Sequence, residues 1–569
     1  MAVLGLRRTF SALETVRAIG LRPVVADLMG FTAMVVAFAR LNPGAGIALA
    51  ELCLALTVLF AWDSAQERTQ PKSATGSFVG ARIEAAVAAA LLASAAGTGT
   101  ARLAGLGLVV LTICFEPLVG RLQTIAVPYA ANIPDVPTYS DARVPSALAF
   151  GVNTAAVGAV AAFSLSGSVF AVGLAAGAAA LLASLAIAAD AAQRILARHR
   201  FEHALPATLK RMGPTFALHW QAPEGTAYQA AMWIPHLQRL GKPFFVLVRT
   251  NVNFDEVRSR FDVPVILRRR LDDLDIVITD SLKSVFYVNT AVRNSHMLRY
   301  TNLTHVQLNH GDSDKVASFN PVFRMYSKDF VAGQAAIDRF AANGVDMPPE
   351  MFAIVGRPQV AGVAVAERPI GETEPKTVLY APTWVGFYSD SDYCSLPAGK
   401  RLVKALIERG CTVVFRAHPY TSRSDESARQ RADIIDLLEA DAAASGRRHL
   451  YGPAAEQEMT IEDCFNASDA LIADVSSVVP DYLFSEKPFA MVAVNTPAHR
   501  FESDFPVAKG GYVIDAFSGK VRGLGKALDR LLQTDPKAAE RKALKAYYLG
   551  DFPPGDYARH FLDRAAEFV

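Results

Sequence analysis

Paired cysteines are missing from this chain of 569 residues. Its five cysteines are Cys53, Cys114, Cys394, Cys411 and Cys464, and no two of them form a Cys-x-x-Cys pair. The pattern therefore argues against a disulfide scaffold and against a structural zinc site. It fits a reducing compartment for the soluble part of the protein.

A strong net charge is missing as well. The 57 basic and 55 acidic residues leave a formal net charge of +2, which indicates little about binding partners. That average combines two unlike regions, because residues up to about 190 are mainly Ala, Leu, Val and Gly while the remainder carries most of the charge. Length and composition together therefore indicate at least two parts.

Long apolar runs dominate the first third. Several approach the roughly 20 residues that a helix needs to cross a hydrocarbon core of about 30 Å. The runs are Pro23–Ala39, Gly44–Trp62, Ile83–Gly97, Leu103–Val119, Pro145–Leu165 and Val169–Ala189. A cleaved signal peptide is a poor alternative, because its usual length is about 15–30 residues. We therefore expect an α-helical transmembrane domain of about six spans over residues 1–190.

Basic residues divide unevenly between the two sets of loops that these spans create. One set carries Arg7, Arg8, Arg17, Arg22, Arg68, Lys72, Arg82, Arg121, Arg143, Arg194, Arg198 and Arg200, and the other carries Arg40 and Arg102. Basic residues accumulate on the cytoplasmic side of membrane helices. The bias predicts a multi-pass protein of the cell membrane, with its N-terminus and its soluble part in the cytoplasm.

Acidic residues and a basic segment add detail to this membrane domain. Asp27, Glu51, Glu84 and Glu116 lie in or beside the spans, and Glu51 is two turns inside its segment. A buried ionisable group in a membrane is a functional candidate, although packing inside the helix bundle is the alternative. Residues 191–212 are predicted to form a basic linker helix, either near anionic lipid headgroups or simply solvated.

From residue 213 onward, short β-branched runs alternate with amphipathic stretches, which is typical of parallel α/β sheets. The predicted strands of the first half are Thr215–His219, Pro243–Val248, Val263–Leu267, Asp275–Thr279, Lys283–Val288, Thr304–Leu308 and Phe352–Val355, with a helix over Thr226–Leu240. Those of the second half are Thr377–Tyr380, Cys411–Phe415, Ala470–Ala473, Phe489–Val494 and Gly511–Ile514. We expect two Rossmann-like domains, residues 213–368 and 369–569, with ligands at the carboxyl ends of the strands.

Three polar motifs follow predicted strands. They are NHGDSDK at residues 309–315, FRAHP at 415–419 and ADVSS at 473–477. The serines of the last motif would open a helix and present hydroxyls and free amides to a phosphate. A plain serine N-cap is the competing interpretation for ADVSS, and a hydrogen-bonded loop histidine is the competing interpretation for NHGDSDK.

Together with the stretch Tyr380–Trp384 and with Asp481, Tyr482, Lys487 and Pro488, these motifs resemble the CDP-glycerol glycerophosphotransferase family. The resemblance covers residues 300–500 best. It implies a GT-B-like fold in which residues 213–368 form the acceptor side and residues 369–569 bind the CDP donor.

The resemblance also implies roles for individual residues. His310 would be the general base, and His418 would act with it at the reacting diphosphate. The donor and its phosphates would be bound by Lys315, Thr383, Arg416, Ser476, Ser477 and Asp481, of which Asp481 would reach the ribose. No cofactor and no metal site are predicted.

Two departures from the family pattern concern phosphate and acceptor recognition. Val385 and Gly386 stand where family members often carry a basic residue, so that phosphate contact is either missing or supplied by another residue such as Arg423. Asp312 and Asp314 intervene before Lys315. They are interpreted either as part of a solvated turn or as hard oxygen ligands of a divalent ion.

The expected function is transfer of glycerol phosphate, or a similar alcohol phosphate, from a CDP-activated donor to a cell-envelope glycan or a lipid-linked acceptor, with release of CMP. One alternative keeps the fold but uses another nucleotide donor, giving a glycosyl- or sugar-phosphate transferase. Another is a transporter or scaffold with a nucleotide-sensing soluble part. Membrane lipids are expected partners, and nucleic acid is not.

Overall fold

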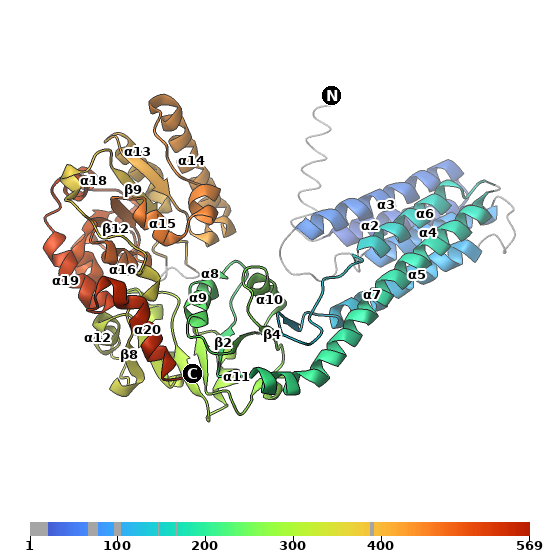
Figure 1. The fold of residues 1–569 in the computed structure, drawn as a ribbon. Helices are drawn as coiled ribbons and strands as arrows, with labels where there is room; N and C mark the ends of the chain where they lie inside the picture. Colours follow the sequence, from blue (N-terminus) through green and yellow to red (C-terminus); the bar gives the residue numbers. More distant parts are fainter. Residues whose placement is uncertain (1–20, 67–77, 96–103, 146, 167, 387–391) are drawn as a thin grey trace. The chain divides into compact units, whose positions relative to one another are not determined.

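The computed structural model describes residues 21–66, 78–95, 104–145, 147–166, 168–386 and 392–569 (Figure 1). The chain divides into two compact units. The first takes its described residues from Met1–Tyr129 and Val136–Ala204, and the second comprises Ala130–Asp135 and Leu205–Val569. Each unit is described by itself below.

The first unit is built from α-helices. Its described helices are α2 (Arg22–Phe38), α3 (Pro43–Gln66), α4 (Val79–Ala95), α5 (Ala104–Ile125), α6 (Ala147–Ala162) and α7 (Val169–Met212), which coincide with the predicted apolar runs. Three of them, over Pro43–Trp62, Ala104–Ile125 and Val169–Met212, are long and apolar enough to cross a membrane. Six spans and their orientation therefore stay a prediction. The last helix continues through Pro206 to Met212.

A buried ion pair joins three helices of the first unit. Arg82 of α4 donates two hydrogen bonds to the carboxylate of Glu116 in α5, at 2.9 and 2.6 Å. Asn153 of α6 donates a third at 2.6 Å. Because burial makes an unpaired charge costly, these contacts give Glu116 a structural role in holding the helices together.

The second unit contains two sheets. The larger has the strand order β1-β4-β3-β2-β5-β6-β7-β8, in which only the β1–β4 pair is antiparallel, and the smaller is a parallel sheet of order β10-β9-β11-β12-β13. The first sheet comprises β1 (Ala130–Ala131), β2 (Phe216–Trp220), β3 (Phe244–Val248), β4 (Val265–Leu267), β5 (Ser284–Tyr287), β6 (Thr304–Gln307), β7 (Lys328–Val331) and β8 (Phe352–Ile354). The second comprises β9 (Thr377–Ala381), β10 (Thr412–Phe415), β11 (Ala470–Ala473), β12 (Phe489–Ala493) and β13 (Tyr512–Asp515).

Helices cover these sheets (Figure 1). In the first half they are α8 (Tyr228–Ala231), α9 (Ile234–Gln238), α10 (Asn251–Arg258), α11 (Ser295–Leu298) and α12 (Gln334–Ala342). In the second half they are α13 (Leu396–Ile407), α14 (Asp425–Ser445), α15 (Ile461–Asn466), α16 (Val478–Tyr482), α17 (Ala498–Asp504), α18 (Leu524–Asp529), α19 (Ala538–Leu549) and α20 (Tyr557–Ala566).

Both faces of the second sheet are buried. Leu379 and Val414 belong to one apolar cluster, whereas Val378 and Val413 belong to another. Successive residues of a strand point to opposite faces, so the near-continuous apolar runs of β9 and β10 reflect a parallel sheet covered on both sides. The predicted pair of α/β sheets is confirmed. The boundary predicted at residue 368 stays a prediction. The C-terminal helix α20 packs on the first half, because Phe561 lies against Trp233 with ring centroids 5.1 Å apart.

Two local predictions in the first half were wrong. The predicted strand Asp275–Thr279 is a 3₁₀ helix over Asp275–Val277, because its amides bond to carbonyls three residues earlier rather than to a neighbouring strand. The predicted helix Thr226–Leu240 is broken into α8 and α9, and Pro235 lies in the first turn of α9, where a missing N–H costs little. Strand β7 was not predicted from its sequence KDFV, which has only two apolar residues.

Candidate active site

Four loops at the carboxyl ends of parallel strands carry the predicted site residues. His310 follows β6, Thr383 follows β9, His418 follows β10 and Ser477 follows β11. The loops of the two halves meet: a Cβ atom built on Gly311 would lie only 2.6 Å from the Ser477 hydroxyl. Glycine is therefore the residue that allows the His310 loop to approach the serine turn this closely.

The His310 ring is oriented by the backbone. Its Nδ1 lies 2.8 Å from the carbonyl oxygen of Val288, which can only accept a hydrogen bond. The neutral ring therefore carries its proton on Nδ1 and leaves Nε2 as an acceptor. Burial lowers the pKa of His310, the Val288 contact opposes this, and nearby Arg357 lowers it further. The arrangement is that of a neutral base at physiological pH.

The His418 ring has the opposite tautomer. The backbone amide of Tyr420 donates to its Nδ1 at 3.1 Å, so the neutral ring carries its proton on Nε2. Burial, followed by the charges of Lys315 and Arg423 and by His310, lowers the pKa of His418 to about 3. His418 is therefore a neutral hydrogen-bond donor.

Tyr228 is close to both histidines. Its ring centroid lies 6.2 Å from that of His310 and 6.5 Å from that of His418. Trp384 stacks on His418 with ring centroids 6.1 Å apart. The two imidazoles thus share one aromatic neighbourhood that joins the first half of the second unit to its second half.

Lys315 reaches from the His310 loop into the second half. Its ammonium group lies 3.5 Å from the hydroxyl of Thr383. Asp474, fully buried, accepts hydrogen bonds from the backbone amides of Thr383 at 2.7 Å and Ser395 at 3.0 Å. Burial raises the pKa of Asp474 to about 7 and lowers that of Lys315. Asp474 was not among the predicted site residues, although it lies in the ADVSS motif.

The serine turn offers hydroxyls to a ligand. Ser476 Oγ is buried and has no hydrogen-bond partner in the described part of the chain. Ser477 stands at the N-cap of α16, yet its side chain makes no capping hydrogen bond. The plain N-cap interpretation is therefore wrong for Ser477. Because α16 has only five residues, phosphate binding here would depend on the hydroxyls more than on the helix dipole.

Arg416 and Asp481 are engaged in contacts within the protein. Arg416 donates to the carbonyl oxygens of Ala455 and, at 2.8 Å, of Met459. Asp481 forms a two-point ion pair with Arg357, at 2.9 and 3.2 Å. Their predicted contacts with the donor stay predictions. Arg357, which sequence reasoning did not select, is the buried arginine that follows β8 and lies near His310.

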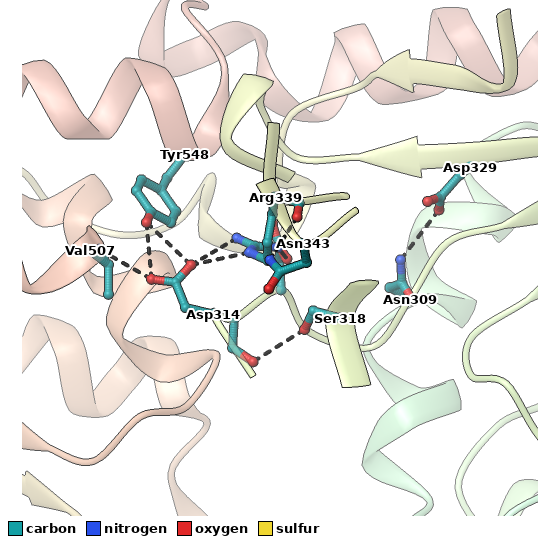
Figure 2. Close-up of polar contacts among 10 residues, drawn as sticks. Asn309, Asp314, Ser318, Asp329, Arg339, Asn343, Val507 and Tyr548 are labelled. Carbon is teal, nitrogen blue, oxygen red and sulfur yellow. Dashed lines mark hydrogen bonds and ion pairs between the residues drawn. The ribbon is translucent and has the colours of Figure 1, made fainter. Parts of the chain in front are cut away.

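The two aspartates of NHGDSDK bind Arg339 of α12. Figure 2 shows Asp314 beside Arg339 and Tyr548. Arg339 lies 2.5 Å from a carboxylate oxygen of Asp312 and 3.1 Å from one of Asp314. Asp314 also accepts from the amide of Val507 at 3.2 Å and from the hydroxyl of Tyr548 at 3.1 Å. The solvated-turn interpretation is wrong for Asp314, whose side chain is only 4% exposed. No cluster of metal-ligating residues is found among the described residues.

This contact fixes the His310 loop from both halves. Arg339 belongs to the first half, whereas Val507 and Tyr548 belong to the second. Burial raises the pKa of Asp314, and the charge of Arg339 opposes that change. Asp314 therefore connects the loop that carries His310 to elements of both halves.

Comparison with known families gives one match. Residues 363–515 match the family model described as CDP-Glycerol:Poly(glycerophosphate) glycerophosphotransferase. The predicted resemblance is confirmed, and it favours an enzyme over a transporter or scaffold. Thr383, His418 and Ser477 lie inside the matched segment, whereas His310 and Lys315 lie outside it. A search of curated proteins found no match.

Solved structures show distant likenesses. A Listeria monocytogenes protein described as a UDP-N-acetylglucosamine 2-epimerase is 14% identical, with 61% of this chain and 94% of that chain covered and a TM-score of 0.41. The wall teichoic acid polymerase TagF is 13% identical, with 66% and 95% covered and a TM-score of 0.40. Anabaena HepE, solved with UDP and glucose, is 10% identical, with 62% and 99% covered and a TM-score of 0.37.

Proposed function

Because this chain is a CDP-glycerol glycerophosphotransferase-like enzyme, we propose that it transfers glycerol phosphate, or a similar alcohol phosphate, from a CDP-activated donor to a cell-envelope glycan or a lipid-linked acceptor. The observation that carries the proposal is the pair of neutral histidines with opposite tautomers, His310 and His418, which share Tyr228 as a neighbour. Residues 213–368 would hold the acceptor, and residues 369–569 would hold the donor.

The reaction we propose begins at His310. Its Nε2 takes the proton of an acceptor hydroxyl, whose oxygen attacks the β-phosphorus of the donor. A new oxygen–phosphorus bond forms while the bond between that phosphorus and the bridging oxygen breaks, and CMP leaves with the electron pair. The proton remains on His310 until it passes to solvent.

Charge that develops on the phosphoryl oxygens needs donors already in place. The Nε2 proton of His418, the hydroxyls of Ser476 and Ser477 and the ammonium group of Lys315 would supply them. The contact of 3.5 Å between Lys315 and Thr383 supports a position for Lys315 at the boundary of the two halves. Stabilisation by prearranged donors is commonly the largest contribution to such catalysis.

We also propose that the enzyme is a multi-pass protein of the cell membrane with its catalytic part in the cytoplasm. Three helices of sufficient length and apolar character support membrane association. The asymmetric distribution of arginine between the loops supports the orientation. Cysteine accessibility measured on intact cells and on inverted membranes would test it, because a cysteine placed at exposed His499 should react only from the cytoplasmic side.

The decisive test of the activity is CMP release from CDP-glycerol by the purified full-length protein. His310→Ala and His418→Ala should each lower kcat by about 10²-fold or more, the usual contribution of a general base or a positioned donor. His499→Ala, an exposed histidine of α17, is the matched control and should retain full activity. Full activity of both active-site variants would exclude this mechanism. Release of UDP from UDP-sugars would instead favour a glycosyltransferase, and release of UMP would favour a sugar-phosphate transferase.

A further inference from the structure

Arg249 is a buried cation that forms no ion pair with a carboxylate among the described residues. It follows β3, its side chain is 0% exposed, and its Nε donates to the carbonyl oxygen of Arg268 at 2.6 Å. Its Nη2 donates to the carbonyl of Arg270 at 3.2 Å and to Nδ1 of His296 at the same distance. Its Nη1 is buried and has no hydrogen-bond partner among the described residues.

The groups around Arg249 are mostly cationic. Arg293 donates to the carbonyl oxygen of Arg249 at 3.0 Å and forms no ion pair in the described part of the chain. His296 accepts from Arg249 at Nδ1, so its neutral ring carries a proton on Nε2. Burial and the neighbouring Arg293 lower the pKa of Arg249 to about 10, which keeps it charged at neutral pH.

Nearby acids are largely engaged by other arginines. Arg270 pairs with Asp272 at 2.7 Å, and Arg299 pairs with Asp275 at 2.6 Å. Asp273 favours the charged form of Arg249 but forms no ion pair with it within the described residues. Arg249 and Arg293 therefore leave an excess of positive charge over the acids that face them.

A buried positive charge is unfavourable unless an anion neutralises it or hydrogen-bond acceptors occupy its N–H groups. Phosphate suits this cluster, because a guanidinium group presents two parallel N–H donors that match two phosphate oxygens. Nη1 of Arg249, the guanidinium of Arg293 and Nε2 of His296 would together offer donors to one such group.

The cluster lies on the acceptor half, at the same edge of the sheet as His310. Arg249 follows β3 and His310 follows β6, and the order β3-β2-β5-β6 separates the strands by three spacings. At about 4.8 Å per spacing, the two positions are about 14 Å apart along the edge. An acceptor chain with its hydroxyl at His310 could therefore place a phosphate farther along the chain near Arg249.

We propose that Arg249, Arg293 and His296 form a binding site for a phosphate group of the acceptor, which makes the enzyme selective for acceptors that already carry phosphate. This inference rests on the proposed function for the identity of the ligand. The chemistry shared by all sources is a phosphate oxyanion, whether it is inorganic phosphate, a glycerophosphate oligomer or a phospholipid headgroup.

Direct binding is measured first, with inorganic phosphate and the purified full-length protein. Saturating CDP is present so that the donor site is occupied, and the melting temperature is followed as phosphate is added. Phosphate should protect the native protein and the Arg269→Gln control, an exposed arginine of the loop that follows β4. Arg249→Gln and Arg293→Gln should each raise the phosphate concentration for half-maximal protection about tenfold or more, as expected for loss of a charged hydrogen bond.

Steady-state kinetics with different acceptors then identify which molecule carries the phosphate that binds at this site. With a soluble glycerophosphate trimer, both variants should raise the acceptor KM about tenfold or more while kcat and the KM for CDP-glycerol stay within about twofold. With glycerol as a phosphate-free acceptor, native enzyme and variants should be equal. Selective binding of vesicles that contain phosphatidylglycerol, without an effect on trimer KM, would overturn the assignment to the acceptor.

The outcomes separate this inference from the proposed function. If CDP fails to raise the melting temperature and no CMP is released, the proposed function fails while phosphate protection still tests the site. If Arg249→Gln is unfolded, Arg293→Gln and the conservative Arg249→Lys variant decide instead. Equal phosphate protection of native protein and every folded variant would overturn the site.

Discussion

Replacing Arg339 by methionine should destabilise the second unit through the two carboxylates that this arginine neutralises. The side chains of Arg339, Asp314 and Asp312 are 7%, 4% and 18% exposed, so water cannot replace the lost partner fully. Removing one member of a buried pair costs about 3–5 kcal/mol. At about 2 °C per kcal/mol for a unit of this size, the melting temperature should fall by about 6–10 °C.

Tryptophan fluorescence of the purified full-length protein would measure this change, because Trp220, Trp233 and Trp384 all belong to the second unit and only Trp62 belongs to the first. Arg500→Met is the matched control. Its ion pair with Asp504 is exposed and should contribute at most about 1 kcal/mol.

A triple variant tests the electrostatic reason for the effect. Combining Arg339→Met with Asp312→Asn and Asp314→Asn removes the stranded charges and should recover much of the lost stability. A fall of less than about 2 °C in the single variant would refute the reasoning, since that corresponds to only about 1 kcal/mol. Failure of the triple variant to recover would show that shape, rather than charge, dominates at this position.

Three further predictions concern other parts of the chain. Gly311→Ala should lower activity by about tenfold or more, because its Cβ would lie 2.6 Å from Ser477 Oγ. Adding Ser477→Gly removes that clash and should return the amide hydrogen exchange of the His310 loop to that of the native protein. Burial lowers the pKa values of His219 and His418 to about 3. The unfolded chain therefore binds protons on these histidines below about pH 6.5, and the free energy of unfolding should fall by up to about 1.4 kcal/mol per pH unit for each histidine. Denaturant unfolding between pH 8 and 5 measures this fall, and a free energy of unfolding that does not change with pH would contradict it. Arg82→Met should strand a buried carboxylate in the first unit and lower the yield of folded protein in detergent, whereas unchanged yield would show that the ion pair is dispensable.

The regular parts of the fold could be predicted because their signal is local. The apolar runs of β9 and β10 and the long apolar helices appear directly as windows of the sequence. The strand predicted over Asp275–Thr279 was wrong, because a short apolar run does not specify whether its amides bond to a neighbouring strand or to its own preceding turn. Strand β7 was missed because its buried Asp329 gives a polar pattern.

The contacts inside the site could be predicted less completely because they join residues far apart in the chain. Sequence reasoning selected His310 and His418, but their opposite tautomers depend on Val288 and on the Tyr420 amide, which only the folded chain brings into place. The partner of Asp314 was equally invisible, since Arg339 lies on a helix beyond the next strand.

The packing of α20 has a consequence for the order in which a newly made chain can become active. Phe561 supports the ring of Trp233, and the indole N–H of Trp233 donates to the carbonyl oxygen of Asn309, the residue before the proposed base. Ribosomes produce α20 long after the His310 loop, so a growing chain would present that loop without its support. Such a chain would hold Asn309 and the loop behind it in this position only once synthesis had passed α20.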